Sequence, residues 1–389
     1  MNSVRLLAIA FFLVYATTGA SSPNLSIYLE QLGADYARIS AILATHAIVL
    51  MIFSYLWGRI SDHLRRRKPL VVGGLFGMSL SFGLMAIIPS DGFAWAVKLF
   101  DAVMMAAYAT TSLAFLGDLL ADSETRGQQM GTYRGLGSVS FALGAFAAGP
   151  IVDAFGIRPI YALGAGLLFI AGLVALMVHE PPLATPAPTQ TASAPERLPI
   201  IFLIGVTLWA CAFSAAYSMW PNYLTSLGYP KSTANWLWGL TAIAELPFMN
   251  LVGLLADHIG RTPVLVMGGV GMGFVLMGYL VFSRWIIGLM GVQLFRSFAY
   301  SSFTATSMIY ATETGTARTR AGTVGIYNMA MSLGQVVGLA VGGQIVQRSS
   351  FQTLFWISTA IFMSSGLIFS LLRWRQPDEQ PLGSAQAGR

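Results

Sequence analysis

Long apolar stretches recur along the whole chain and are separated by short polar breaks. Each is close to the roughly 20 residues that a helix needs to cross the hydrocarbon core of a bilayer. The pattern predicts twelve membrane-spanning helices, at residues 5–29, 38–57, 69–88, 93–118, 128–150, 158–179, 199–222, 233–252, 263–282, 286–309, 323–346 and 351–372. We interpret the N-terminal stretch as the first span rather than as a signal peptide. Four prolines are expected to loosen the helices: Pro23, Pro150, Pro221 and Pro247.

A segment rich in Pro, Ala and Thr divides the chain into two parts of similar length and predicts a solvated linker. The predicted organisation is a six-helix half at 1–179, a cytoplasmic linker at 180–199, a second six-helix half at 200–375 and a cytoplasmic tail at 376–389. The halves repeat at an offset of 195 residues, so that Tyr28 matches Tyr223. The predicted fold class is therefore an all-α membrane protein of two six-helix repeats. Such a repeat places a binding site between the halves, near the middle of the membrane.

The composition supports a membrane protein and removes other classes. Of the 389 residues, 55% are hydrophobic and only 10% are charged, whereas soluble proteins have about 25% charged residues. The net charge of +6 does not indicate nucleic acid as a partner, because the basic residues form no stripe. They gather in alternate loops, which by the positive-inside rule places both termini in the cytoplasm. We expect a multi-pass protein of the inner (plasma) membrane, surrounded by membrane lipid. The single cysteine, Cys211, excludes a disulfide framework.

Charged loops follow the predicted spans 38–57 and 233–252 and share one spacing of Gly, Asp and Arg. Their residues are Gly58, Asp62 and Arg66 in the first copy and Gly253, Asp257 and Arg261 in the second. With six spans on each side of a linker, they resemble the repeated cytoplasmic loop motif of the major facilitator superfamily. The resemblance covers the whole chain and implies the fold and the transport activity of that superfamily. The first copy departs from the motif, because Arg65 stands where the second copy keeps Gly260.

The charges of these loops are spaced to form ion pairs. Asp62 and Arg66 are four residues apart and can share one face of a helical turn. Asp118 and Glu313, each at the cytoplasmic end of a predicted span, are third partners in the first and second halves. The resemblance implies that these groups latch the cytoplasmic side in the outward-facing state. The alternative is that the loop charges only set topology and solubility.

Glu245 lies about midway along a predicted span. Its segment Gly239–Met249 resembles the one that bears the buried glutamate in bacterial sugar-efflux transporters and, less closely, in lactose-permease-like symporters. Tyr133-Arg134 resembles a segment whose arginine contacts substrate in both groups. An ionisable group in mid-span costs about 2.5–3.5 kcal/mol and so needs a partner, water or a function. We expect Arg134 and Glu245 to face each other, so that proton and substrate compete for one carboxylate. The alternative is a purely structural salt bridge.

Asp101 and Arg296 occupy equivalent positions in the two halves under the offset of 195 residues. Opposite charges at equivalent positions predict a pair across the halves that closes the outer side. Lys98, one turn before Asp101, offers a local partner instead. Both alternatives are open at this point.

Uncharged polar side chains in the spans provide further candidates for contact with a small-molecule substrate. The strongest are Asn24, Tyr133, Tyr327 and Asn328, because amides, hydroxyls and aromatic faces suit a sugar ring or a small aromatic solute. Ser and Thr in membrane helices more often bond their own backbone or a neighbouring helix. His46 is open to two interpretations, a proton relay or a satisfied interior histidine.

The sequence contains no phosphate-binding loop, and its four histidines are scattered. We therefore expect no cofactor and no metal, and an energy source in a proton or solute gradient. An enzyme is not expected, because no convincing nucleophile or His–acid pair is present. A sensor without transport should tolerate loss of Glu245 and Arg134. The leading hypothesis is proton-coupled efflux of a sugar, glycoside or drug-like solute by an alternating-access monomer. The alternative is a proton symporter that imports a sugar or an aromatic acid.

Overall fold

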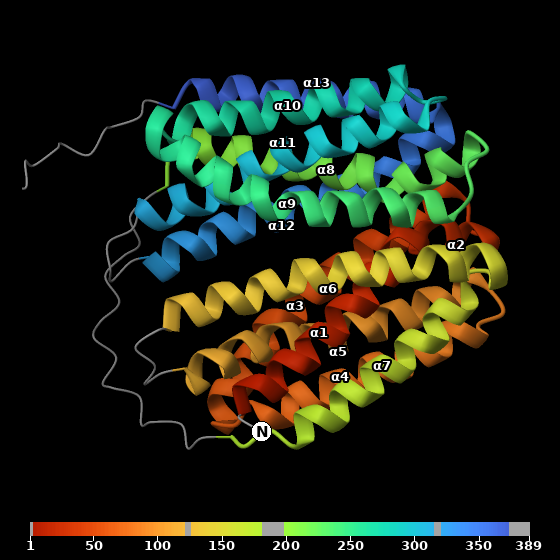
Figure 1. Ribbon diagram of the computed structural model, residues 1–389, viewed down its shortest axis with the longest axis vertical. Coiled ribbons are helices and arrows are strands. Elements are labelled where there is room, and N and C mark those ends of the chain that lie inside the picture. The colour runs from red at the N-terminus through yellow and green to blue at the C-terminus, as the bar shows by residue number, and fades with distance from the viewer. Residues whose placement is uncertain (1–2, 121–125, 181–197, 315–319, 373–389) are drawn as a thin grey trace, which may run out of the picture.

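The computed structural model describes residues 3–120, 126–180, 198–314 and 320–372, and all regular elements in these ranges are helices (Figure 1). The first span of the N-terminal half is built from α1 (Ser3–Ser21), the short 3-10 helix η1 (Ser22–Asn24) and α2 (Leu25–Gln31). The other spans are α3 (Tyr36–Leu64), α4 (Lys68–Ile87), α5 (Asp91–Leu119), α6 (Arg126–Phe155) and α7 (Arg158–Leu176). The interruption at η1 coincides with Pro23, which lacks a backbone N–H and crowds the preceding turn.

The C-terminal half contains six further helices. They are α8 (Ile200–Ser226), α9 (Ser232–Ile259), α10 (Arg261–Val281), α11 (Ile286–Glu313), α12 (Arg320–Arg348) and α13 (Phe351–Ser370). In contrast to Pro23, the other three prolines lie inside continuous helices, Pro150 in α6, Pro221 in α8 and Pro247 in α9. The expected loosening therefore becomes a change of helix type only in the first span.

Eleven spans of the described residues are long and apolar enough to cross a membrane, α1 to α2 counting as one. The remaining long helix, α11, has 28 residues and a polar face that is buried in the protein. That face carries Gln293, Arg296, Ser297, Ser301 and Ser302. Because polar residues in a membrane helix are tolerated where they face the bundle interior, α11 is the twelfth span. The predicted fold class is confirmed.

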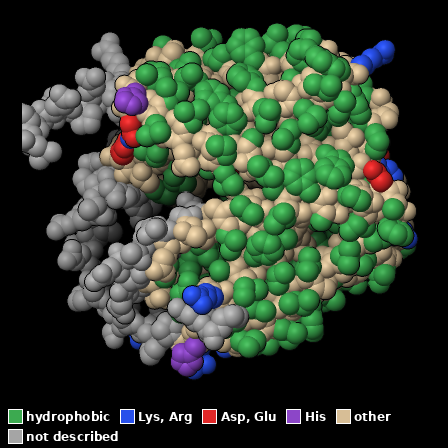
Figure 2. All heavy atoms as spheres, in the orientation of Figure 1, with side chains coloured by type: hydrophobic (Ala, Val, Ile, Leu, Met, Phe, Trp, Pro, Cys, Tyr) green, Lys and Arg blue, Asp and Glu red, His purple; other side chains and the backbone are tan. Residues whose placement is uncertain are grey.

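Apolar side chains cover the sides of both halves, and the charged side chains lie toward the two ends of the bundle (Figure 2). Such a belt is what the hydrocarbon core of a bilayer requires. We call the end that carries Asp62 and Asp257 the motif end. The opposite end, which carries Glu30 and Tyr36, is called the far end.

The two halves touch mainly along two helix pairs, α3 with α12 and α6 with α9, with smaller contacts such as that of α2 with α8. The closest approach lies near the far end, where a Cβ added to Gly343 would come within 1.8 Å of the Tyr36 carbonyl oxygen. Nearby, Asn222 Nδ2 donates to Glu30 Oε2 at 2.6 Å, and the Tyr36 hydroxyl donates to Glu30 Oε1 at 2.9 Å. The Tyr36 backbone N–H donates to Gln347 Oε1 at 3.2 Å. These contacts close the far end.

A cavity of about 580 Å³ lies between α1, α6 and α9, nearer the motif end. Most of the side chains around it are apolar, namely Val4, Ala8, Tyr133, Leu136, Val139 and Leu246, and two are polar, Gln129 and Thr132. Figure 2 shows the surface hollowed between the halves on its left side. The protein is thus closed at the far end and open toward the motif end.

Candidate functional site

Arg296 lies at the centre of a cage of aromatic rings in the C-terminal half. Its guanidinium carbon is 4.5 Å from the ring centre of Tyr217, 5.5 Å from that of Trp238 and 5.9 Å from those of Phe213 and Tyr300. The rings come from α8, α9 and α11, and helical spacing brings them together. Phe213 and Tyr217 are four residues apart, as are Arg296 and Tyr300, so each pair shares a helix face.

The cage replaces water as the environment of a buried charge. Arg296 is only 4% exposed, and its Nε has no hydrogen-bond partner among the described residues. An Arg within about 6 Å of an aromatic ring centre gains roughly 0.5–2 kcal/mol, most where it is desolvated. A carboxylate within ion-pair distance would stabilise it further, yet no such pair of Arg296 is found among the described residues. The site therefore holds a cation whose hydrogen-bonding capacity is partly unused.

Glu245 lies on α9, seven residues after Trp238 and hence on the same face two turns later. Its side chain is partly buried, and the charge of Arg296 acts on it electrostatically. Phe141 of α6 stacks on Trp238 with ring centres 6.0 Å apart, which places this group at the interface of the halves. The side chain of Arg134, the predicted partner of Glu245, lies outside the described residues. That pairing stays a prediction, and Arg296 is the cation that the structure describes near Glu245.

A chain of hydrogen bonds extends from the cage to α10. Gln293 Oε1 accepts from the hydroxyls of Thr241 at 3.1 Å and Tyr279 at 2.9 Å, and the Tyr279 hydroxyl is 3.3 Å from that of Tyr217. Gln293 precedes Arg296 by three residues and lies on the same face of α11. Gln293, Thr241 and Tyr279 are not among the residues predicted from the sequence to form the site. The signal that was available is the spacing of Gln293 from Arg296 on a span of low hydropathy.

The structure brings Asp101 together with Lys98 and His46 rather than with Arg296. Lys98 Nζ donates to Asp101 Oδ2, and His46 Nε2 lies 3.5 Å from the same oxygen. The local pairing with Lys98 is therefore the arrangement seen here. Under the offset of 195 residues, Lys98 matches Gln293, His46 matches Thr241 and Asp101 matches Arg296. Equivalent positions thus carry a neutralised charge cluster in one half and a caged cation in the other.

The four uncharged candidates differ in their surroundings. Asn24 is buried, its Nδ2 donates to the Ala20 carbonyl at 2.7 Å, and its Oδ1 has no described partner. Tyr133 lines the cavity with its ring centre 4.0 Å from that of Phe11. The Tyr327 hydroxyl lies 2.9 Å from that of Ser307 on α11. Asn328, the next residue, is exposed.

The second loop motif forms a compact ion-pair cluster at the motif end. Arg261 Nη1 donates to Asp257 Oδ1 at 2.6 Å, and Nη2 donates to Glu313 Oε1 at 3.0 Å. Gly260 precedes it with φ 91°, which is the left-handed region that glycine adopts without a steric penalty. This turn carries the chain from α9 into α10 and aims Arg261 at both carboxylates.

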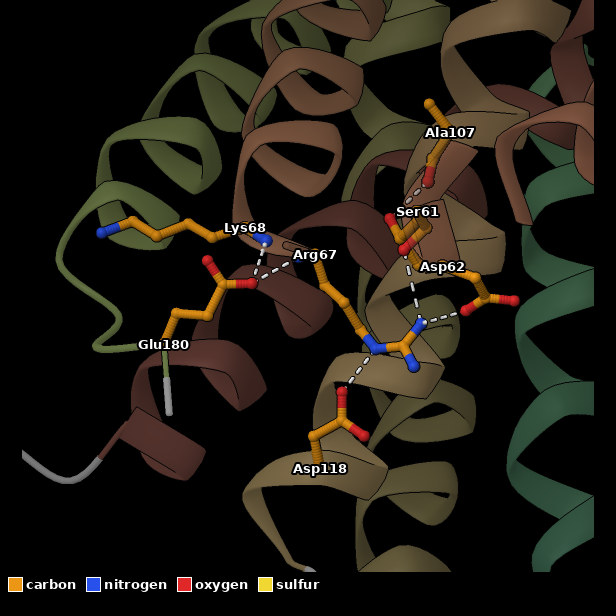
Figure 3. A network of polar contacts seen from close by, with 8 residues as sticks. Ser61, Asp62, Arg67, Lys68, Ala107, Asp118 and Glu180 are labelled. Carbon is orange, nitrogen blue, oxygen red and sulfur yellow. Dashed lines mark hydrogen bonds and ion pairs between the residues drawn. The ribbon is translucent and has the colours of Figure 1, made fainter. Parts of the chain in front are cut away.

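The first loop motif uses a different arginine (Figure 3). Arg67 Nε donates to Asp118, and its Nη1 lies 3.6 Å from Asp62 Oδ1. Arg65 ends α3 with φ 50°, so the backbone adopts a left-handed turn even without glycine. The arginine that reaches both carboxylates is consequently one position later than the expected Arg66.

The spacing that the two loop motifs share also includes one glycine in each copy, both inside helices. A Cβ added to Gly58 would lie 3.6 Å from the side chain of Thr110, an ordinary contact. A Cβ added to Gly253 would meet nothing within 4 Å. Neither glycine is therefore required by close packing in this conformation.

Comparison with known proteins places this arrangement in a family. Residues 4–357 match the family model described as the MFS_1 like family. The chain belongs to this family of major facilitator transporters. It is similar to the multidrug resistance protein MdtG of Proteus mirabilis, with 24% identity over 95% of each chain. It is also similar to the sugar efflux transporter B of Salmonella typhimurium, with 22% identity over 96% of each chain.

Solved structures show the same fold. An alanine mutant of the nucleoside transporter NupG superposes with a TM-score of 0.81 and 17% sequence identity, over 95% of this chain and 99% of that one. The family membership and the helices together establish a multi-span transporter of the inner membrane, which is not an enzyme. The resemblance to the major facilitator superfamily noted from the loop motifs is confirmed.

Proposed function

We propose that the transporter exports a small organic solute in exchange for protons, with Glu245 as the group that carries the proton. The observation that supports this most directly is the position of Glu245. It is a partly buried carboxylate at the interface of the halves, within the electrostatic reach of the caged cation Arg296. A carboxylate at that depth can be neutralised in two ways, by the cation or by a proton. A solute that uses the same charges therefore competes with the proton.

We further propose that the motif end is cytoplasmic, as are both termini. The loop arginines and lysines at that end support this orientation through the positive-inside rule. In that orientation the closed far end and the open cavity correspond to an inward-facing state. The twelve helices already enclose a pathway, so a monomer suffices as the functional unit.

The loop clusters fit the role of a latch for the opposite, outward-facing state. The side chain of Asp62 is 75% exposed and that of Asp257 is 63% exposed, although each is paired with an arginine. They therefore keep surface available to the other half when the motif end closes. All partners described for Asp257 belong to its own half, which is what an open motif end requires.

The class of solute is proposed from the relatives. A multidrug resistance protein and a sugar efflux transporter align with nearly the full chain, and both names denote resistance or export. A sugar, a glycoside or a drug-like solute is the corresponding cargo here. The partly apolar cavity and the aromatic cage can bury the ring of such a solute.

A second candidate is proton symport, in which the transporter imports a sugar or an aromatic acid. The specific observation in its favour is the caged Arg296, a buried cation with an unpaired donor. An anionic group on the solute would complete its pairing.

The test uses everted membrane vesicles with an imposed, inside-acid proton gradient and a pH-sensitive dye. Sugars, glycosides, aromatic acids and lipophilic drugs are added one at a time. We expect dye recovery with one class, and loss of that recovery in Glu245→Gln. The matched control is Asp35→Asn, which also removes a carboxylate but keeps a side chain able to cap α3. Normal proton movement in Glu245→Gln would show that the proton is carried elsewhere.

A further inference from the structure

Three hydrogen-bond donors without partners converge at the aromatic cage. Among the described residues, Arg296 Nε, Gln293 Nε2 and Trp238 Nε1 are buried and donate to nothing. The Trp238 ring lies 5.5 Å from the guanidinium carbon of Arg296, and Gln293 is one turn away on α11. The three donors therefore belong to one small region of the protein.

Buried donors without partners are rare in folded proteins, because each loses its hydrogen bonds to water and gains none in return. The rings around Arg296 attract its charge, and the side chain of Tyr217 is a hydrogen-bond partner of the guanidinium, yet Nε is left without a partner. The oxygen of Gln293 already accepts from Thr241 and Tyr279, which fixes the amide with its Nε2 unpaired. What these three donors lack is an acceptor, and a negatively charged one would also pair with the cation.

The surroundings also favour a particular kind of body for the group that supplies the acceptor. Trp238, Phe213 and Tyr300 are only partly buried, whereas Arg296 is 4% exposed. A solute would therefore reach the guanidinium by passing between flat aromatic faces. Those faces stack well on a planar ring, and the planar fork of an arginine matches a carboxylate.

We propose that the transported solute is an aromatic carboxylate, whose carboxylate binds Arg296 and the unpaired donors of Gln293 and Trp238 while its ring packs in the cage. This inference rests on the second candidate of the proposed function, proton symport, because it assumes that proton and solute occupy the site of Glu245 and Arg296 together. Of the two solute classes named for that candidate, a sugar or an aromatic acid, it selects the charged one and names the groups that bind its charge.

The same arrangement predicts how proton and solute are coupled. Glu245 and the carboxylate of the solute both interact with Arg296 and repel each other. The solute therefore binds best when Glu245 carries a proton. Proton and anion then occupy the site together, which is the order of events in the symport candidate.

Binding to the purified full-length transporter in lipid nanodiscs tests this directly. The probes are radiolabelled benzoate and benzyl alcohol, which share a ring and differ in charge. We expect benzoate to bind at least tenfold more tightly than benzyl alcohol. Arg296→Gln should remove that preference, and Arg296→Lys should retain part of it. Glu245→Gln should tighten benzoate binding and make it less sensitive to pH.

The outcomes separate this inference from the proposed function. Equal binding of both probes, or binding of neither, would overturn the assignment of an aromatic carboxylate. So would an unchanged benzoate preference in both Arg296 variants, provided that they elute from size exclusion like the parent protein. Solute-driven proton movement by a sugar or a drug in the vesicle assay would leave the proposed function standing in each of these cases. Benzoate binding together with unchanged proton movement in Glu245→Gln would overturn the proposed function, but it would still support the proposed binding site for the carboxylate.

Discussion

Arg296 is stabilised by induced and quadrupolar attraction to rings rather than by a carboxylate in contact. Four ring centres lie within 5.9 Å of its guanidinium carbon. Each such contact recovers part of the cost of removing a cation from water, but Nε is left without a hydrogen-bond partner among the described residues. A residue selected for stability alone would be apolar at this position, because replacing buried charges by apolar groups of similar volume is often stabilising. The charge is consequently best explained by function.

The first prediction concerns this conflict between stability and function. Arg296→Met keeps most of the side-chain length and removes the charge. We expect the thermal midpoint of unfolding to stay the same or to rise by a few degrees, while transport is lost. The measurements are unfolding followed by tryptophan fluorescence and transport in proteoliposomes. A large fall in the midpoint would show that the cage depends on the cation for its structure.

Individual helices set how closely the halves approach. α12 meets α3 near the far end because Gly343 has no side chain, which lets the backbone reach the Tyr36 carbonyl. Gly144 allows a comparable approach of α6 to Ala16 of α1 within one half. Glycines on these two helices thus serve two purposes, since some join helices within a half and Gly343 joins the halves.

The second prediction tests the role of Gly343. Gly343→Val inserts a side chain where a Cβ alone would overlap the Tyr36 carbonyl oxygen. We expect the far end to open, because the clash acts only while that end is closed. Pulsed spin-label distances between positions 31 and 226, measured in a Cys211→Ser background, should lengthen. Gly325→Val on the same helix, where nothing lies within 4 Å, is the control. An unchanged distance distribution would contradict this prediction, because it would mean that α12 shifts to accommodate the valine while the far end stays closed.

The elements could be predicted from the sequence to within a few residues, and the site only in part. A bilayer fixes the length of a membrane-spanning helix, and the predicted span 286–309 corresponds to α11. This agreement holds even though α11 is more polar than the eleven helices that are apolar enough to cross a membrane. Glu245 and Arg296 stood out because charges are rare in spans. The cage did not, because its rings come from three helices whose distances a single sequence does not contain. The ion pairs of the first loop motif are made by Arg67 and not by the expected Arg66. This difference depends on the backbone conformation with which α3 ends at Arg65.

The whole molecule is two similar halves that meet at one end and separate toward the other. The motif end carries the ion-pair clusters of Arg67 and Arg261, and the far end carries the contacts of Glu30 with Asn222 and Tyr36. Exposed ion pairs contribute little to the stability of a fold, typically about 0–1 kcal/mol. A small contribution is enough to shift an equilibrium between two conformations of nearly equal free energy.

The third prediction follows from that argument. Asp257→Asn weakens the cluster of Arg261 without altering the cavity. We expect the transport rate to fall several-fold, while the affinity for solute and the thermal midpoint of unfolding stay nearly unchanged. Initial rates and solute binding are measured on the same preparation. A loss of binding equal to the loss of rate would remove the distinction between latch and site.

The central claim is that Glu245 couples the proton to the solute. The most direct measurement compares two modes of transport by Glu245→Gln in proteoliposomes, with the solute that gives a dye response in the vesicle screen. One mode is counterflow, in which labelled and unlabelled solute exchange with no net movement of protons. The other is transport driven by an imposed proton gradient. The account predicts that counterflow persists and that proton-driven transport is lost. Proton-driven transport at the parent rate would contradict it.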